Sequence, residues 1–438
     1  MKKLLYLLIL LLPLLGSCKK FIENEVTPQQ ARDSLYFIMK SYYLWYDSMP
    51  SVTRTDYDDP YQLLEAMRYK KRDRWSSVIG YQAFLDEMSG SFVGHGFRIG
   101  LDESNNARIA MIFKSSPLYS LGVRRGWIVR QIKDTDVAPI LISRDGAAYA
   151  DLLGPSTAGY VNKFLFEKPN GSTVTITSAK SSFTYNPVIL YDTIHLKTGK
   201  IAGHLVYESF IDPPVDSLKI AFGFFKANNV TELILDLRYN PGGYFDIVQT
   251  LSSYIKGNGF TTTPLASLSY NDKCTWADTT FNFVNTSYPL DLSRVVFITT
   301  RITASASEAV INGLAPYLDD CVSIGDTTDG KPVGMNGFIC GYKYMFWPIT
   351  FKTRNSDGYG DYFKGLYPDK PAIDDITHDF DDKNETCLSE AIHYLETGSF
   401  SAKGSGYFKN SANFSEKPSW MNNAFLNSEI NSYDLLFR

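Results

Sequence analysis

Residues 301–317 read RITASASEAVINGLAPY and place Ser305 between an apolar, strand-like run (VVFIT) and a helix-like run. Such a junction suits a nucleophile, because the first turn of a helix offers unpaired backbone N–H groups and the positive end of the helix dipole. These groups favour an oxyanion that develops beside an attacked carbonyl. Ser305 is therefore the candidate nucleophile.

The same stretch also has a purely structural interpretation. A serine followed three positions later by Glu308 is typical of a capping box, in which both side chains bond the backbone at the start of a helix. Small neighbours would also let the helix pack closely. Taken alone, the stretch favours this interpretation, so the catalytic one needs support from elsewhere in the chain.

Two further stretches provide that support. Residues 325–334, GDTTDGKPVG, follow another strand-like run and set Lys331 among glycine and threonine. Residues 231–251, TELILDLRYNPGGYFDIVQTL, lead an apolar strand into an Asn-Pro-Gly-Gly turn and then into an amphipathic helix. This turn is predicted to expose its backbone.

In this order and spacing, the three stretches resemble peptidase family S41, which contains the C-terminal processing (tail-specific) peptidases and their tricorn-like relatives. The resemblance implies that Ser305 is the nucleophile and Lys331 the general base. It also implies that the backbone N–H groups of Gly243 and Ala306 form the oxyanion hole, and Gly242 is assigned to substrate binding. Together these residues predict a Ser-Lys dyad that acts through an acyl-enzyme.

One departure from the family pattern concerns the base. Many tail-specific members carry a glutamine four residues after the lysine, where this chain has Met335 followed by Asn336. Either Asn336 orients the base instead, or no orienting residue is needed. The departure affects the expected rate more than the reaction class.

The predicted fold class is α/β, with a ClpP/crotonase-like peptidase core over residues 186–396, as the resemblance implies. Apolar strands without alternation, each followed by a helix, predict a sheet buried on both faces. Asp236 and Arg238 are interpreted as a structural ion pair. His204 is assigned no catalytic role, because the family motif provides a lysine as base.

The chain begins with a segment typical of protein export. Residues 1–18 have a basic start, a short apolar run and a Leu-Gly-Ser-Cys ending that resembles a bacterial lipobox, which predicts lipidation of Cys18. Lipid anchoring would hold the mature chain on a membrane outside the cytoplasm. The alternative is an ordinary secretory signal with an incidental cysteine.

Two further units are predicted around the core. Residues 27–86 form a small helical domain whose helices start at Thr-Pro and Asp-Pro. Its aromatic side chains have two interpretations: they line a binding groove, or they pack into a core, which is the commoner use. We assign this domain no chemistry. Residues 397–438 form a polar C-terminal extension, either an ordered wrap over the core or a loose tail.

Residues 90–185 resemble a PDZ domain. The resemblance rests on Ser-Pro-Leu at 116–118, Gly-Val at 122–123 and Gly-Trp-Ile-Val at 126–129, where Trp127 replaces the usual aspartate. Such domains bind a peptide C-terminus along a sheet edge and hold its carboxylate in a backbone nest. Gly94, Gly96 and Phe97 are the candidate nest, and the alternative is a plain hairpin bend.

Composition excludes several function classes. The net charge of −4 over 438 residues offers no basic field for nucleic acid. The cysteines after Cys18 form no CxxC pair and the five histidines have no metal-ligand spacing, so we predict neither metal nor cofactor. An oxidising compartment would permit disulfides, whose pairing the spacing leaves open.

These observations predict a membrane-anchored serine endopeptidase of extracytoplasmic polypeptides, whose C-termini are the candidate recognition element. The main alternative is an inactive relative whose PDZ-like domain and cleft bind peptides without cutting them. A small-molecule hydrolase or transferase on the same kind of core is a third interpretation.

Overall fold

The computed structural model describes residues 26–88, 91–184, 186–211 and 216–402. The predicted export segment with Cys18 lies outside the described residues, as does the C-terminal extension beyond residue 402. Within the described ranges, no helix has the length and apolar character needed to cross a membrane, and no group of side chains is suited to hold a metal ion. The four described cysteines are free thiols.

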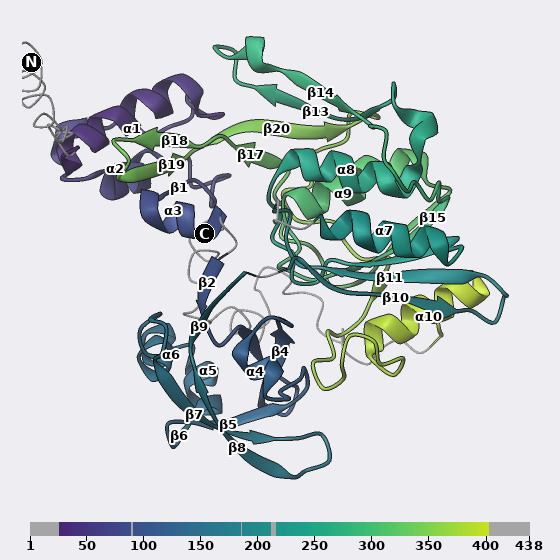
Figure 1. Cartoon of the computed structure of the whole chain (residues 1–438). Helices are drawn as coiled ribbons and strands as arrows, with labels where there is room; N and C mark the ends of the chain where they lie inside the picture. The colour runs from purple at the N-terminus through teal and green to yellow at the C-terminus, as the bar shows by residue number, and fades with distance from the viewer. Residues whose placement is uncertain (1–25, 89–90, 185, 212–215, 403–438) are drawn as a thin grey trace, which may run out of the picture.

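A six-stranded sheet forms the centre of the larger body (Figure 1). Its order is β10-β11-β12-β15-β16-β21; β10 is antiparallel to β11, and the remaining neighbours are parallel. The strands are β10 (Val188–His195), β11 (Ile201–Tyr207), β12 (Glu232–Asp236), β15 (Arg294–Thr299), β16 (Asp320–Gly325) and β21 (Lys370–Pro371).

Helices cover both faces of this sheet, as Figure 1 shows. In β12, Leu233 and Leu235 pack toward one layer of helices, whereas Ile234 packs toward the opposite side. The predicted α/β sheet with two buried faces is therefore confirmed. The first layer consists of α7 (Ser217–Ala227), α8 (Phe245–Lys256) and α9 (Ala306–Leu314), and the opposite face is covered by α10 (Thr386–Thr397).

The N-terminal segment forms the predicted helices and packs into the core structure. Thr27 and Asp59 cap its first two helices by accepting bonds from Gln30 N and Gln62 N. β1 then pairs with β19, so these residues share a sheet and an apolar cluster with segment 333–349. The elements are α1 (Pro28–Tyr42), α2 (Pro60–Met67), β1 (Ser77–Gly80), α3 (Tyr81–Met88), β18 (Phe338–Cys340) and β19 (Tyr344–Trp347).

A second sheet, of order β14-β13-β20-β17, connects this N-terminal unit with the core. Figure 1 shows β20 running from the side of β19 toward α8 and α9, with the β13–β14 hairpin above it. Its strands are β13 (Pro264–Tyr270), β14 (Thr279–Asn282), β17 (Val333–Met335) and β20 (Ile349–Asn355).

Residues 91–184 form a separate β-rich unit below the core in Figure 1. Ser116 caps the short helix α4 (Pro117–Ser120). A ribbon of β2 (Ser91–Gly94) and β9 (Ser181–Thr184) leads into the unit and out of it. Its antiparallel sheet has the path β3 (Phe97–Leu101), β4 (Ala107–Ile112), β5 (Ile128–Ile132), β7 (Val161–Glu167) and β8 (Thr173–Ala179), with α5 (Val137–Ser143) and α6 (Gly146–Leu153) packed nearby.

Candidate active site

Ser305 occupies the turn between β15 and α9, at the N-cap position of the helix. Its φ of 55° is positive, a conformation that costs energy for any residue with a side chain and occurs often at functional sites. The residues on both sides, Ala304 and Ala306, are buried, whereas Ser305 keeps partial exposure. The turn thus presents one hydroxyl at the start of a helix.

The Asn-Pro-Gly-Gly turn after β12 lies directly against Ser305. A Cβ atom on Gly242 would lie 2.8 Å from Ser305 Cβ and 2.9 Å from the Ala306 nitrogen, so only glycine permits this approach. Gly243 has a φ of 141°, and a Cβ atom on it would lie only 2.2 Å from the Phe210 carbonyl oxygen. The predicted oxyanion turn and the predicted nucleophile are therefore neighbours in space.

Asn240 holds the two turns together. Its carbonyl accepts bonds from Ala304 N (3.1 Å) and from the Ser307 hydroxyl (2.9 Å). Its side chain accepts a bond from Gly242 N at 2.9 Å and donates to the Tyr207 carbonyl. Because the Gly242 N–H is engaged in this way, Gly243 is the better placed of the two glycines to donate to an oxyanion.

Lys331 lies on the loop between β16 and β17 and is 3% exposed. Burial lowers the pKa of its amine to about 8, although the charges of Asp329, Asp73 and Glu308 raise it. Three carboxylates thus favour the protonated form of this amine. Burial outweighs them, so a substantial fraction of the amine is neutral near pH 8.

One cavity of about 510 Å³ brings these groups together. Ser305, Lys331, Gly242, Gly243 and Ala306 all line it. The remaining wall is largely apolar and includes phenylalanine side chains at 210, 281 and 351. An apolar cavity with a few convergent polar groups is the usual form of a ligand site.

Glu308 is the functional residue that sequence reasoning treated only as a helix cap. Its carboxylate is buried and accepts bonds from Ser305 N (2.9 Å), Lys331 N (2.8 Å), Gly330 N (2.7 Å) and the Thr328 hydroxyl (2.5 Å). The capping-box pattern signalled the first contact alone. One side chain thus connects the backbone of the candidate nucleophile with that of the candidate base.

Asn336 also lines the cavity, where the sequence suggested it as an orienter of Lys331. Its backbone N–H donates to the Thr350 hydroxyl (3.0 Å), which in turn donates to Asn336 Oδ1 (2.7 Å). Asn336 is therefore anchored to β20, and its action on the base stays a prediction. Met335, which replaces the family glutamine, lines the same cavity.

Asp236 and Arg238 form the predicted ion pair, at 2.8 Å, but within a larger buried network. Arg238 also pairs with Asp374 (2.8 Å) and Glu385 (3.0 Å). Arg125 of the β-rich unit joins through Asp374, at 3.0 Å. Arg238 precedes the Asn-Pro-Gly-Gly turn by two residues, and the network links that unit to the core.

Two buried histidines, His204 and His95, lie outside the walls of the Ser305 cavity. His204 is buried on β11, and burial lowers its pKa to about 4. His95 is buried in the β-rich unit, 3.1 Å from the Ser178 hydroxyl, with a pKa lowered to about 3, chiefly by burial. Neither is a charged group at neutral pH.

In the predicted carboxylate nest, Gly94 ends β2, Gly96 lies in the connection and Phe97 begins β3, and none of the three lines the Ser305 cavity. Phe97 is fully buried in the core of the β-rich unit. A Cβ atom on Gly96 would meet Ser116 at 2.4 Å and the Phe183 ring at 2.7 Å. Close packing therefore explains this glycine, and carboxylate binding here stays a prediction.

Comparison with protein families adds an independent finding. Residues 202–371 match the family model described as peptidase family S41, and residues 31–77 match the peptidase S41 N-terminal domain. The first match contains the Ser305 turn, the Lys331 loop and the Asn-Pro-Gly-Gly turn. The second covers most of α1, all of α2 and the segment with Arg74 and Trp75, which contact Asp329 in the Lys331 loop.

Individual relatives are distant. A probable CtpA-like serine protease of Staphylococcus saprophyticus is 22% identical over 300 residues, which are 66% of this chain and 55% of the relative's length. The crystal structure of a putative S41 protease from Bacteroides fragilis matches with a TM-score of 0.69 at 24% identity, over 84% of this chain and 97% of that one. The structural match supports the fold.

Proposed function

The chain belongs to peptidase family S41, and from this premise we propose that it is a serine endopeptidase with a Ser305–Lys331 dyad. One observation carries the proposal: Ser305, the buried Lys331 and the two predicted oxyanion donors line a single cavity. At physiological pH, a lysine with a pKa near 8 is neutral, and so able to accept a proton, in a far larger fraction of molecules than an ordinary lysine.

The reaction follows from this arrangement. Neutral Lys331 takes the proton from Ser305 Oγ as the oxygen attacks a peptide carbonyl. The backbone N–H groups of Gly243 and Ala306 stabilise the oxyanion of the tetrahedral intermediate. Lys331 then gives its proton to the leaving amine, and water hydrolyses the acyl-enzyme by the same steps in reverse. Polypeptides are the proposed substrates, and their C-termini a possible recognition element.

A fluorophosphonate probe tests this proposal, because it reacts with activated serines. We expect the wild-type chain to be labelled, with the tag on Ser305 in peptide mapping, and Ser305→Ala to be unlabelled. Ser156→Ala, which changes an exposed loop serine, is the matched control and should label fully. Loss of casein cleavage should accompany loss of labelling.

Equal labelling of wild type and Ser305→Ala would overturn the nucleophile assignment. Labelling of neither, with retained binding of unfolded protein, would favour the alternative of an inactive peptide-binding relative. Turnover of small esters without any cleavage of unfolded protein would favour a small-molecule hydrolase.

We also propose that Cys18 is lipidated and anchors the mature chain to a bacterial membrane, facing away from the cytoplasm. The lipobox-like ending of the export segment supports this proposal. Several acyl chains on one cysteine would give stable binding, whereas one chain gives only marginal binding.

Cys18→Ala should therefore move the protein from the membrane fraction to the soluble fraction, with peptidase activity of the mature chain unchanged. Cell fractionation followed by immunoblotting measures this. Ser17→Ala is the matched control, because it leaves the cysteine and a small residue before it, and should stay with the membranes. A Cys18→Ala variant that fractionates like wild type would contradict lipid anchoring.

A further inference from the structure

Residues 73–76 of the N-terminal unit lie against the loop that carries Lys331. The indole nitrogen of Trp75 donates to Asp329 Oδ2 at 3.0 Å. The Arg74 guanidinium lies 3.2 Å from the same oxygen and also donates to the Asp329 carbonyl. Asp329 precedes Lys331 by two positions. Two side chains of a segment distant in the sequence therefore contact the loop that carries Lys331.

Segment 73–76 is itself anchored by hydrogen bonds and burial. Asp73 is buried and accepts bonds from the Tyr43 hydroxyl (2.7 Å) and from the backbone N–H groups of Trp75 and Ser76 (2.9 Å each). Trp75 is 1% exposed, and the Arg74 guanidinium lies over its ring at 4.6 Å. The contacts of Arg74 and Trp75 with the Asp329 side chain therefore come from a well-anchored segment outside the catalytic core.

The loop is fixed on its other side by the core. Asp329 N donates to the Thr303 carbonyl at 2.9 Å, within the turn that leads to Ser305. Thr328 N donates to the Leu366 carbonyl at 3.0 Å. Movement of the Asp329 side chain therefore changes the charge near Lys331 without freeing the loop backbone.

Four charged side chains act on the Lys331 amine besides its burial. Asp329, Asp73 and Glu308 favour its protonated form, and Arg74 favours its neutral form. Arg74 thus has two effects that oppose Asp329: it neutralises that carboxylate by pairing with it, and it repels a proton from the lysine itself.

We propose that Arg74 and Trp75 are positioning residues for Lys331, acting through the carboxylate of Asp329. The N-terminal unit, to which we assigned no chemistry from its sequence, thereby affects the protonation of the base in the catalytic core. This inference rests on the proposed role of Lys331 as the general base.

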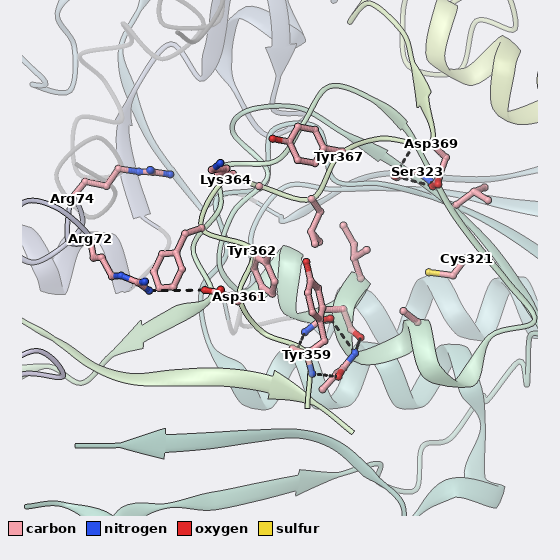
Figure 2. Close-up of a pocket in the computed structure, with 18 of the residues that line it drawn as sticks. Arg72, Arg74, Cys321, Ser323, Tyr359, Asp361, Tyr362, Lys364, Tyr367 and Asp369 are labelled. Atoms are coloured by element: carbon pink, nitrogen blue, oxygen red, sulfur yellow. Dashed lines mark hydrogen bonds and ion pairs between the residues drawn. The ribbon is translucent and has the colours of Figure 1, made fainter. Parts of the chain in front are cut away.

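Arg74 is well suited to a test by substitution. Figure 2 shows it reaching from the N-terminal unit into a second cavity, of about 680 Å³, which it shares with Arg72 and Lys364. Its side chain is 51% exposed, so its removal opens no hole in a packed core. Lys71 also lines this cavity and is exposed, which makes Lys71→Met a matched control for the loss of one nearby positive charge.

The test measures the pH dependence of kcat/KM for a fluorogenic peptide in variants that remove charges of opposite sign near Lys331. Arg74→Met should move the midpoint of the rising limb upward by roughly half a pH unit or more, and Asp329→Asn should move it downward by about one. Arg74→Lys should restore most of the wild-type midpoint. Trp75→Phe should lower kcat, and Lys71→Met should leave the midpoint unchanged.

General structural damage would lower kcat in all variants without moving the midpoint in opposite directions. Midpoints that stay together, or shift in the same direction, would overturn the proposal. An independent readout is NMR titration of the Lys331 amine, which needs no activity. If the fluorophosphonate probe labels neither the wild type nor any variant, the peptidase proposal fails. Opposite shifts of the Lys331 titration in Arg74→Met and Asp329→Asn would still support the positioning roles of Arg74 and Asp329.

Discussion

Replacing Lys331 with arginine should reduce peptide cleavage by about 10²- to 10⁴-fold, the usual contribution of a general base. The loss should appear in kcat at every pH between 6 and 10, because a guanidinium does not release its proton in this range. The buried position of Lys331 offers little room for the larger group, so retained folding must be shown by circular dichroism. Lys352→Arg, on an exposed position of β20, is the matched control.

The wild-type pH profile provides the second half of this prediction. Burial lowers the pKa of Lys331 to about 8, so kcat/KM should rise with pH up to that value as the amine loses its proton. Burial and the charge of Asp329 raise the pKa of Glu308 to about 7. Below that pH the Glu308 carboxylate gains a proton and loses one site that accepts a hydrogen bond from the residues around Ser305 and Lys331. The decrease of kcat/KM with falling pH should therefore become steeper. A Lys331→Arg variant with wild-type turnover would show that another group takes the proton.

Local patterns were enough to predict the α/β fold class, whereas the candidate dyad was located through the resemblance of three such stretches to family S41. The strands around Ser305 and the turn at 240–243 are encoded by apolar runs and glycines within a few residues of one another. Parallel strands bring their carboxyl ends to one edge of a sheet, so the residues after β12, β15 and β16 converge without further information. The cavity at this edge is a consequence of topology.

Contacts between distant segments could not be predicted in this way. The Trp75–Asp329 bond joins residues 254 positions apart, and the Arg238–Glu385 contact spans 147. Neither pair leaves a local signal, because a buried tryptophan and a loop aspartate are ordinary residues in their own neighbourhoods. The Asp236–Arg238 pair was predictable because its members are two residues apart, yet its larger network was not.

Glu308→Gln should lower kcat by about 10²-fold, although the two side chains have nearly the same shape. The Glu308 carboxylate accepts two donors on each oxygen: Thr328 Oγ1 and Gly330 N on one, Ser305 N and Lys331 N on the other. Glutamine has one oxygen and one NH₂ group. In either orientation, its NH₂ group therefore faces at least one backbone N–H donor and loses that bond, whereas the Thr328 hydroxyl can rotate to accept from it.

Each orientation of the glutamine would disturb catalysis. If the NH₂ group faces Ser305 N and Lys331 N, the link between nucleophile and base is lost directly. If it faces Thr328 and Gly330, the Lys331 loop loses its support instead. A buried donor without an acceptor costs about 1–3 kcal/mol, so the thermal midpoint should fall as well.

The measurements are kcat, probe labelling of Ser305 and thermal unfolding on the same preparations. Glu103→Gln, at an exposed position, is the matched control and should match wild type in all three. Because Glu308 contacts the backbone of both Ser305 and Lys331, its loss should slow labelling and peptide cleavage together. Wild-type kcat in Glu308→Gln would mean that the helix cap is only structural, as the capping-box interpretation of the sequence implies.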